Sequence, residues 1–194
     1  MDNFSDKIFY YLNRPKFFIG LARAQLFYRF FFGSIGRKTM VISPELITNP
    51  SKIFIGANVI IHPGARILCI TDFHGQQYNP IIKIGNDVKI QQGLHMSCAD
   101  EIEIQNGVTI AQYVGIFDID HNFHDTTKPI HAQGITAKKI LIGQNSFIGK
   151  GTVIMGGTKI GKNCVVGANS VVRGAFPDYS VLSGSPAKIL YKLN

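Results

Sequence analysis

The residues best suited to chemistry lie in one segment, FDIDHNFHD, at residues 117–125. His121 is its central imidazole, and imidazoles exchange protons near neutral pH, so His121 is a candidate general base. Asp118 and Asp120 are the carboxylates that could orient it. Strand alternation puts both on one side of the chain and His121 on the other unless the chain turns there, so the spacing fixes neither pairing.

Familiar catalytic signatures are missing from the rest of the sequence. There is no GxSxG nucleophile elbow, no phosphate-binding Walker loop and no dinucleotide-binding GxGxxG in its strand–helix context.

A second histidine, His95, lies in the segment GLHMSC. It is a candidate for a supporting role beside His121, or else a histidine that only packs on its own strand.

Six consecutive hexads must help to position these side chains. They run from Ile142 to Pro177 and read IGQNSF, IGKGTV, IMGGTK, IGKNCV, VGANSV and VRGAFP. The first place is always Ile or Val, and the fifth is small in all but the last. A period of six fits neither a helix nor a half-buried strand, so it predicts a solenoid whose coils bury their aliphatic side chains on one another. Glycine at the second place suggests a corner with backbone angles that glycine adopts readily.

Earlier hexads occur at residues 55–66, 84–101 and 104–115, with the first coil expected near Ile53. Residues 71–80 break the phase, and residues 122–139 leave the pattern altogether. Long loops in compact domains are usually functional or disordered, and functional loops carry specificity. Both are therefore predicted to leave the coil and to shape an acceptor pocket. The predicted fold class is an all-β solenoid with an N-terminal helical segment.

The domain prediction has three parts: a helical, aromatic and basic segment over residues 1–40, the coil over 41–177, and a tail over 178–194. In the first part every charge between Asp6 and Glu45 is positive. Pro15 is predicted to separate two short helices, because proline favours a first helical turn. Two interpretations stay open: the segment packs on the coil or on a neighbouring subunit, or it rests on an anionic membrane surface.

Overall charge and cysteine content narrow the function classes. The net charge of +8, from 20 basic and 12 acidic residues, suggests an anionic partner. No run of Lys and Arg is dense enough to indicate nucleic-acid binding. No apolar run is long enough to span a bilayer, and none resembles a signal peptide. Three scattered cysteines form no disulfide framework, which favours a reducing cytoplasm.

Taken together, these motifs resemble the hexapeptide-repeat acyltransferases, a family with a left-handed parallel β-helix. The likeness covers about residues 25–194 and is strongest at DIDHNFHD, in the hexads after Ile142, at GANSVVRGAFPDYSV (167–181) and at GSPAKIL (184–190). The subgroup it resembles most is the O-acetyltransferases of surface-polysaccharide and O-antigen assembly. The resemblance implies left-handed winding, acetyl-CoA as co-substrate, and a homotrimer with each active site between two subunits.

The resemblance also implies roles for individual residues. His121 would be the general base that deprotonates a sugar hydroxyl, with His95 and Asp118 in support. The residues implied in CoA binding are Lys150, Ala168, Arg173, Lys188 and Lys192. Basic side chains suit the CoA phosphates. Related γ-class carbonic anhydrases bind zinc on this coil, but the spacing of His121 and His124 does not match their ligand set, so no metal is expected.

The expected function is an acetyl-CoA-dependent transfer to a sugar hydroxyl in surface polysaccharide biosynthesis. The acceptor is expected to be a sugar, a glycolipid or a nucleotide sugar, and the enzyme to be cytoplasmic or peripheral on the inner face of the membrane. Two alternatives stay open. One is N-acetylation of an amino sugar nucleotide, where the amine needs less help from a base. The other is a non-catalytic trimeric scaffold, which would need neither His121 nor a long loop.

Overall fold

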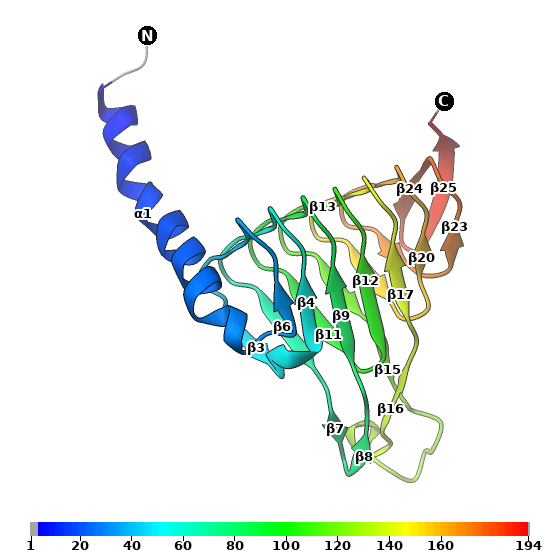
Figure 1. Cartoon of the computed structure of the whole chain (residues 1–194). Helices are drawn as coiled ribbons and strands as arrows, with labels where there is room; N and C mark the ends of the chain where they lie inside the picture. The colour runs from blue at the N-terminus through cyan, green and yellow to red at the C-terminus, as the bar shows by residue number, and fades with distance from the viewer. Residues whose placement is uncertain (1–3, 194) are drawn as a thin grey trace.

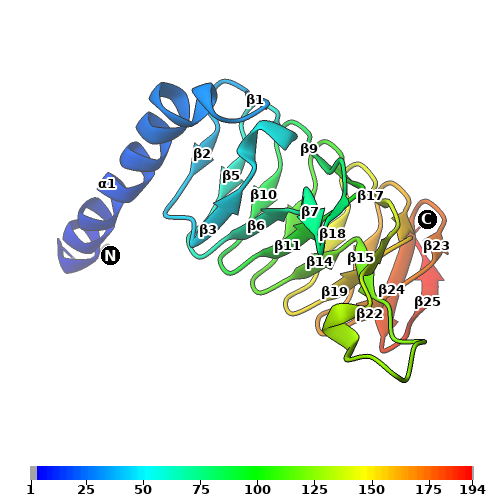
Figure 2. The same ribbon diagram turned by 90° about the horizontal axis from the view of Figure 1, so that it is seen from below.

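The computed structural model describes residues 4–193, with side chains from Pro15 onward. Within these residues, the chain winds into a coil whose walls are three parallel β-sheets, with one long helix at its N-terminal end (Figure 1). Seen from below, the successive turns stack into a three-sided prism (Figure 2). The expectation of a parallel solenoid is therefore met.

The three sheets are built from short strands, one per sheet in each turn. The first sheet contains β1 (Ser34–Ile35), β4 (Ile53–Ile55), β9 (Ile81–Ile84), β12 (Glu101–Ile104), β17 (Ile140–Ile142), β20 (Lys159–Ile160) and β23 (Ala175–Phe176). The second contains β2 (Met40–Val41), β5 (Ile60–Ile61), β10 (Lys89–Ile90), β13 (Thr109–Ile110), β18 (Phe147–Ile148), β21 (Val165–Val166), β24 (Ser180–Gly184) and β25 (Ala187–Lys192). The third contains β3 (Leu46–Thr48), β6 (Arg66–Cys69), β11 (His95–Cys98), β14 (Gly115–Phe117), β19 (Val153–Met155) and β22 (Val171–Val172).

The aliphatic residues at the first place of each hexad form the core, as the period predicts. Ile142, Ile148, Ile154, Ile160, Val166 and Val172 are all fully buried. The strand register stacks them directly, with Ile142 between Ile104 and Ile160. The small fifth residues are also buried, and their hydroxyls bond to the next turn: Ser146 Oγ donates to the Gly161 carbonyl at 3.0 Å. Each turn can thus bury a polar atom without leaving it unpaired.

The expected role of the second-place glycines was wrong. The left-handed φ angles occur at the fourth place, for example at Asn145 (58°) and Gly151 (68°). Gly143, at the second place, lies against the backbone of Gly161 in the next turn, where a Cβ would collide. Glycine is therefore needed there for the close approach of two turns.

The coil extends further than residues 41–177 at both ends. Its first turn begins at Ser34 and runs through β1, β2 and β3. At the other end β24 continues the second sheet, and β25 turns back antiparallel along it. The segment predicted as a tail is therefore a β-hairpin closing the last turn.

The prediction of two helices separated at Pro15 was also wrong. A single helix, α1 (Phe4–Leu26), runs through Pro15 and is followed by the short 3-10 helix η1 (Tyr28–Phe30). The φ fixed by proline is a helical value, so the helix can continue through Pro15, although proline has no N–H to donate to the preceding turn. The second half of α1 packs on the first turn: Ala24 is fully buried, and Gln25 Nε2 donates to the Gly36 carbonyl at 3.0 Å. Within the described residues, no helix has the length and apolar character needed to cross a bilayer.

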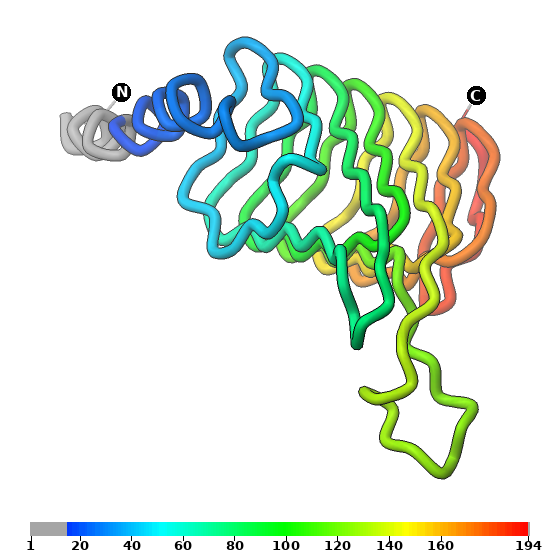
Figure 3. Tube along the Cα trace, turned by 60° about the horizontal axis from the view of Figure 1, so that its bottom comes forward, coloured from blue at the N-terminus to red at the C-terminus, as the bar shows by residue number. Residues whose placement is uncertain are grey.

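Two segments project from one corner of the prism (Figure 3). The first forms the small hairpin of β7 (Asp72–Phe73) and β8 (Gln76–Gln77). The second leaves the coil as β15 (Ile119–His121) and returns as β16 (Ile135–Ala137), with the 3-10 helix η3 (Ile130–Ala132) before the return. A further 3-10 helix, η2 (Pro50–Lys52), precedes β4.

Candidate active site

The two projecting segments are joined where they leave the coil. The hydroxyl of Tyr78, at the end of the first, donates to the carbonyl oxygen of Ile135 in β16 at 3.1 Å. Where the chain returns from the longer segment, Lys139 Nζ lies 2.8 Å from Glu101, which also pairs with Lys83 at 2.6 Å. These links fix both segments to the first sheet.

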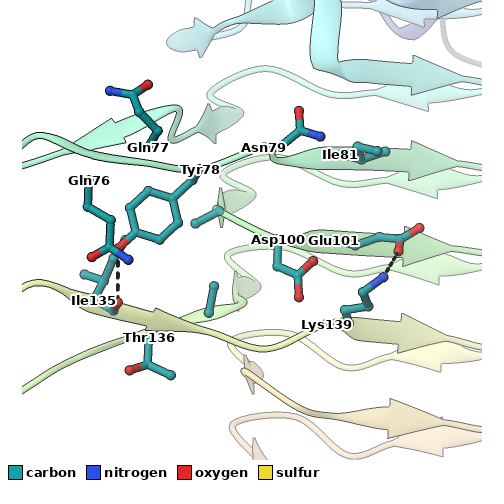
Figure 4. Close-up of a pocket in the computed structure, with 12 residues that line it drawn as sticks. Gln76, Gln77, Tyr78, Asn79, Ile81, Asp100, Glu101, Ile135, Thr136 and Lys139 are labelled. Atoms are coloured by element: carbon teal, nitrogen blue, oxygen red, sulfur yellow. Dashed lines mark hydrogen bonds and ion pairs between the residues drawn. The ribbon is translucent and has the colours of Figure 1, made fainter.

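A pocket of about 650 Å³ lies between these links (Figure 4). Its lining is mostly polar and comes from both projecting segments and from the strand ends beside them. It consists of Gln76, Gln77, Tyr78, Asn79, Ile81, Ala99, Asp100, Glu101, Ile135, Thr136, Ala137 and Lys139. Amide, hydroxyl and charged groups of this kind can bind a ligand that carries many hydroxyls.

His121 lies at the end of β15, next to this pocket. It pairs with Ile135 across the antiparallel ladder, and Ile135 itself lines the pocket. The imidazole is exposed, and its centroid lies 5.8 Å from that of Phe73 in the first hairpin, edge to face. The exposed imidazole of His121 thus lies between a strand ladder and an aromatic ring, and it does not itself line the pocket.

Asp118 makes its hydrogen bonds with the backbone of Ala99 and Asp100. Its carboxylate is 1% exposed and accepts hydrogen bonds from the backbone N–H groups of Ala99 and Asp100, both at 2.8 Å. Burial raises the pKa of the Asp118 carboxyl, although those amide bonds act in the opposite direction. Through these contacts Asp118 stabilises the backbone at the corner of the coil that contains Ala99 and Asp100. They argue against its expected role in orienting His121.

Asp120 pairs with Arg173, which lies just after β22. Arg173 Nη2 lies 2.7 and 2.9 Å from the two carboxylate oxygens of Asp120. Both contacts use Nη2 alone and the side chain is half-exposed, so the expected contact of Arg173 with CoA phosphate stays a prediction. The contact ties the strand that ends in His121 to a turn of the coil more than fifty residues later in the chain.

His95 lies at the start of β11, on the outer face of the third sheet. Its ring packs edge to face on Phe117, with centroids 5.2 Å apart. Burial, with a further contribution from Arg66, lowers the pKa of His95. It is therefore favoured in the neutral form, which can both donate and accept a hydrogen bond. His95 and His121 pack on different phenylalanines, and His121 belongs to the separate ladder of β15 and β16.

The residues expected to bind CoA do not all lie together: some lie at one corner of the prism and others lie elsewhere. Lys150 and Ala168 lie on consecutive turns at the corner between the second and third sheets, where the Asn169 N–H donates to the Lys150 carbonyl at 2.8 Å. Lys188 pairs with Ser183 in the closing hairpin, and Ser183 touches Gly167 at this same corner. Two exposed lysines beside an exposed alanine suit a phosphate-bearing arm. Lys192 pairs with Ser180, further along the hairpin.

Several residues of the site were missed by sequence reasoning. Phe73, Tyr78 and the ion pair of Glu101 with Lys139 lie in or beside segments that break the hexad phase. The only signal was that break, which marks a projection without giving its contacts. Among residues 4–193, no three His, Cys, Asp or Glu side chains converge as a metal site would require.

Comparison with known proteins agrees with the fold and the motifs. The family description "Bacterial transferase hexapeptide (six repeats)" matches residues 139–174. An Escherichia coli protein assigned as a lipopolysaccharide biosynthesis O-acetyl transferase, WbbJ, is 31% identical over 91% of this chain and 89% of its own length. A Mycobacterium tuberculosis protein assigned as an acetyltransferase is 34% identical over 76% of this chain, which spans only 52% of that protein.

Among solved structures, the N-acyltransferase AntD from Bacillus cereus, in complex with dTDP and 3-hydroxybutyryl-CoA, superimposes with a TM-score of 0.74. It shares 19% identity, and the match covers 90% of each chain. At that identity the match establishes the fold, which for this family is a left-handed β-helix. Together with the repeat match and the close length agreement with the Escherichia coli relative, it leads to one conclusion. The chain belongs to the hexapeptide-repeat family of acyltransferases.

Proposed function

We propose that the protein transfers the acetyl group of acetyl-CoA to a sugar hydroxyl during biosynthesis of a surface polysaccharide, an O-antigen or a capsule. The observation that carries the proposal is the setting of His121. Its exposed imidazole is held beside a polar pocket by Phe73 and by the β15–β16 ladder. The Escherichia coli relative, matched over nearly its whole length, supports the choice of a lipopolysaccharide-type acceptor.

In the proposed reaction His121 accepts the proton of the sugar hydroxyl. The hydroxyl oxygen then forms a bond to the acetyl carbonyl carbon, the carbon–sulfur bond breaks, and the imidazolium returns its proton to the departing thiolate. A well-placed base of this kind contributes roughly 10²- to 10⁴-fold in rate. Phe73 restricts the ring, and the pairing of Asp120 with Arg173 restricts the strand that carries it.

Acetyl-CoA supplies the activated acetyl group. Lys150 and Lys188 are the residues that we expect to hold its phosphates, with the backbone at Ala168 along its pantetheine arm. All three are exposed and lie at one corner of the prism. We retain Lys192 and Arg173 as weaker candidates, Arg173 because its guanidinium also pairs with Asp120.

We propose a homotrimer with each active site between two subunits. Within one chain, the corner of Lys150 and the projecting segment of His121 are separated by the third sheet. A neighbouring subunit that brings its lysine corner to His121 would complete a site. Acetyl-CoA is a cytoplasmic metabolite, so we place the enzyme in the cytoplasm, peripheral on the inner face of the membrane.

The decisive experiment measures CoA-thiol release against a panel of glycans, glycolipids and nucleotide sugars. His121→Ala should lower transfer to a hydroxyl at least about 100-fold with the oligomer intact, because the coil does not need the imidazole. His124→Ala is the matched control and should have little effect, since its ring is exposed further out and packs on Phe123. A larger loss in His124→Ala would contradict the assignment of His121.

The position of the site between subunits has its own test. Mixed trimers of His121→Ala and a Lys150→Ala/Lys188→Ala variant should recover activity that neither parent has. Recovery requires one intact histidine and one intact lysine corner to meet across an interface. Mixed trimers that stay as inactive as their parents would show that each site belongs to a single chain.

A second function is favoured by one observation. The AntD fold match is an N-acyltransferase solved with dTDP, which points to an amino sugar nucleotide as acceptor. An amine is nucleophilic without strong base assistance. Transfer to an amino sugar nucleotide that survives in His121→Ala would favour this N-acetyltransferase.

A further inference from the structure

The N-terminal end of the coil carries an exposed aromatic surface, defined here by Leu26, Phe27, Phe30, Phe31 and Leu46. Phe30 is 76% exposed, and Phe27 and Phe31 are 63% and 64% exposed. Four large apolar side chains within six residues of sequence, all largely in water, exceed the scattered exposure that is normal for a folded domain. A surface of this kind indicates a binding partner.

An apolar groove of about 370 Å³ runs into this aromatic surface. Its walls are apolar apart from one carboxylate, Glu45, which pairs with Arg66 at 2.6 Å. The groove is lined by Phe27, Tyr28, Phe31, Phe32, Pro44, Glu45, Leu46, Ile47 and Pro50. The side of α1 that faces the coil is already covered, since Gly20 and Ala24 are buried against it. Figure 1 shows the helix meeting the coil only at its C-terminal part and extending away from it.

Positive charges predominate around the aromatic surface, where the carboxylate of Glu45 is already paired with Arg66. Arg23 lies one turn before Phe27 on α1, and the Arg29 guanidinium lies 5.5 Å from the centre of the Phe30 ring. The exposed basic residues of this end are Lys16, Arg23, Arg29, Arg37 and Lys38. No Asp or Glu occurs between residues 7 and 44. The partner must therefore accept aromatic side chains and attract cations.

We infer that this surface docks the enzyme on an anionic lipid bilayer. Aromatic side chains favour the boundary between lipid headgroups and acyl chains, and each basic residue near an anionic leaflet strengthens binding. A contact that paired this surface with the same surface of a second copy would bring two sets of cations together, which like-charge repulsion disfavours. The inference does not depend on the proposed reaction, because neither His121 nor the pocket beside it belongs to this surface.

Vesicle flotation of the full chain provides the test. The protein should float with phosphatidylcholine vesicles that contain about 30% phosphatidylglycerol, float poorly with phosphatidylcholine alone, and detach as salt is raised. Arg23→Gln/Arg29→Gln should weaken binding by about fivefold for each charge removed. Phe30→Ser/Phe31→Ser should weaken it by at least about tenfold, since two inserted aromatic rings are lost.

Matched controls separate this surface from the general positive charge of the protein. Lys89→Gln/Lys159→Gln removes two exposed cations from the coil, and Leu190→Ser removes an exposed apolar side chain at the far end. Both should bind vesicles like the unmodified protein. Equal losses in the controls would overturn the inference. Light scattering measures the oligomeric state of the same variants. If Phe30→Ser/Phe31→Ser dissociates the oligomer and leaves flotation unchanged, the surface is a subunit contact.

Discussion

Asp118 offers the sharpest test of how this site is built, because its expected chemistry and its observed contacts disagree. Replacing it with alanine removes the acceptor of two backbone N–H groups, one of them on Ala99, which is only 3% exposed. Hydrogen bonds to a charged acceptor contribute about 1.5–3 kcal/mol each. The cost of burying the carboxylate, which raises its pKa, offsets part of the stabilisation from these two hydrogen bonds. We therefore expect Asp118→Ala to lower the free energy of unfolding by about 2–4 kcal/mol.

The assay is urea unfolding followed by circular dichroism at fixed protein concentration, paired with the thermal midpoint. For a chain of this size the loss corresponds to a fall of roughly 5–15 °C in Tm. Asp118→Asn keeps one acceptor oxygen and should lose about half as much. Our reasoning fails if Asp118→Ala unfolds within about 0.5 kcal/mol of the unmodified protein while transfer falls 100-fold. That result would mean that the carboxylate acts on His121 after all.

Three further predictions test the links around the site and the core. Arg173→Gln should lower kcat and leave the KM for acetyl-CoA unchanged. The double variant Arg173→Gln/Asp120→Asn should lose no more activity than Arg173→Gln alone, because both substitutions break the same ion pair. A raised KM for acetyl-CoA in Arg173→Gln would instead indicate that Arg173 binds CoA. Hydrogen bonds from Lys139 and Lys83 hold the pKa of Glu101 below its ordinary value. The contribution of Glu101 to the free energy of unfolding is therefore fully present above about pH 4.5 and is lost as the pH falls through the lowered pKa. Glu101→Gln should flatten the acid side of a stability–pH curve from urea unfolding by at most about 1 kcal/mol. Ile160→Asp should abolish soluble expression, since it buries an unpaired charge, while the exposed Lys159→Asp should fold normally.

The phase of the coil could be read from the sequence because it repeats. Each hexad offers the same aliphatic to the same interior position, and a mistake at one turn would be contradicted by the next. The first turn was missed although its pattern is present: IGRKTM, VISPEL and ITNPSK bring Ile35, Val41 and Ile47 into phase with Ile53. The aromatic and basic character of the neighbouring residues obscured it.

The contacts of the site could not be read in the same way, because they join segments far apart in the chain. Arg173 reaches Asp120 only because two turns of the coil bring the third sheet and the projecting strand together. Tyr78 meets Ile135 across the two projections, where no repeat constrains either partner. The histidine itself was identified by type and position, and its ring partner, Phe73, required the structure.

The covered ends of the second sheet also bear on whether the protein can polymerise. A stack of parallel turns exposes unpaired backbone groups at its first and last strands, which invites another copy to continue the ladder and grow a fibre. Here α1 lies across the first turn at Gly20 and Ala24, and β25 runs antiparallel along β24, so the direction of the last strand is reversed. A copy that approaches the second sheet meets α1 at one end and, at the other, a strand that runs against the direction of the sheet. These caps therefore disfavour the growth of a filament along this sheet.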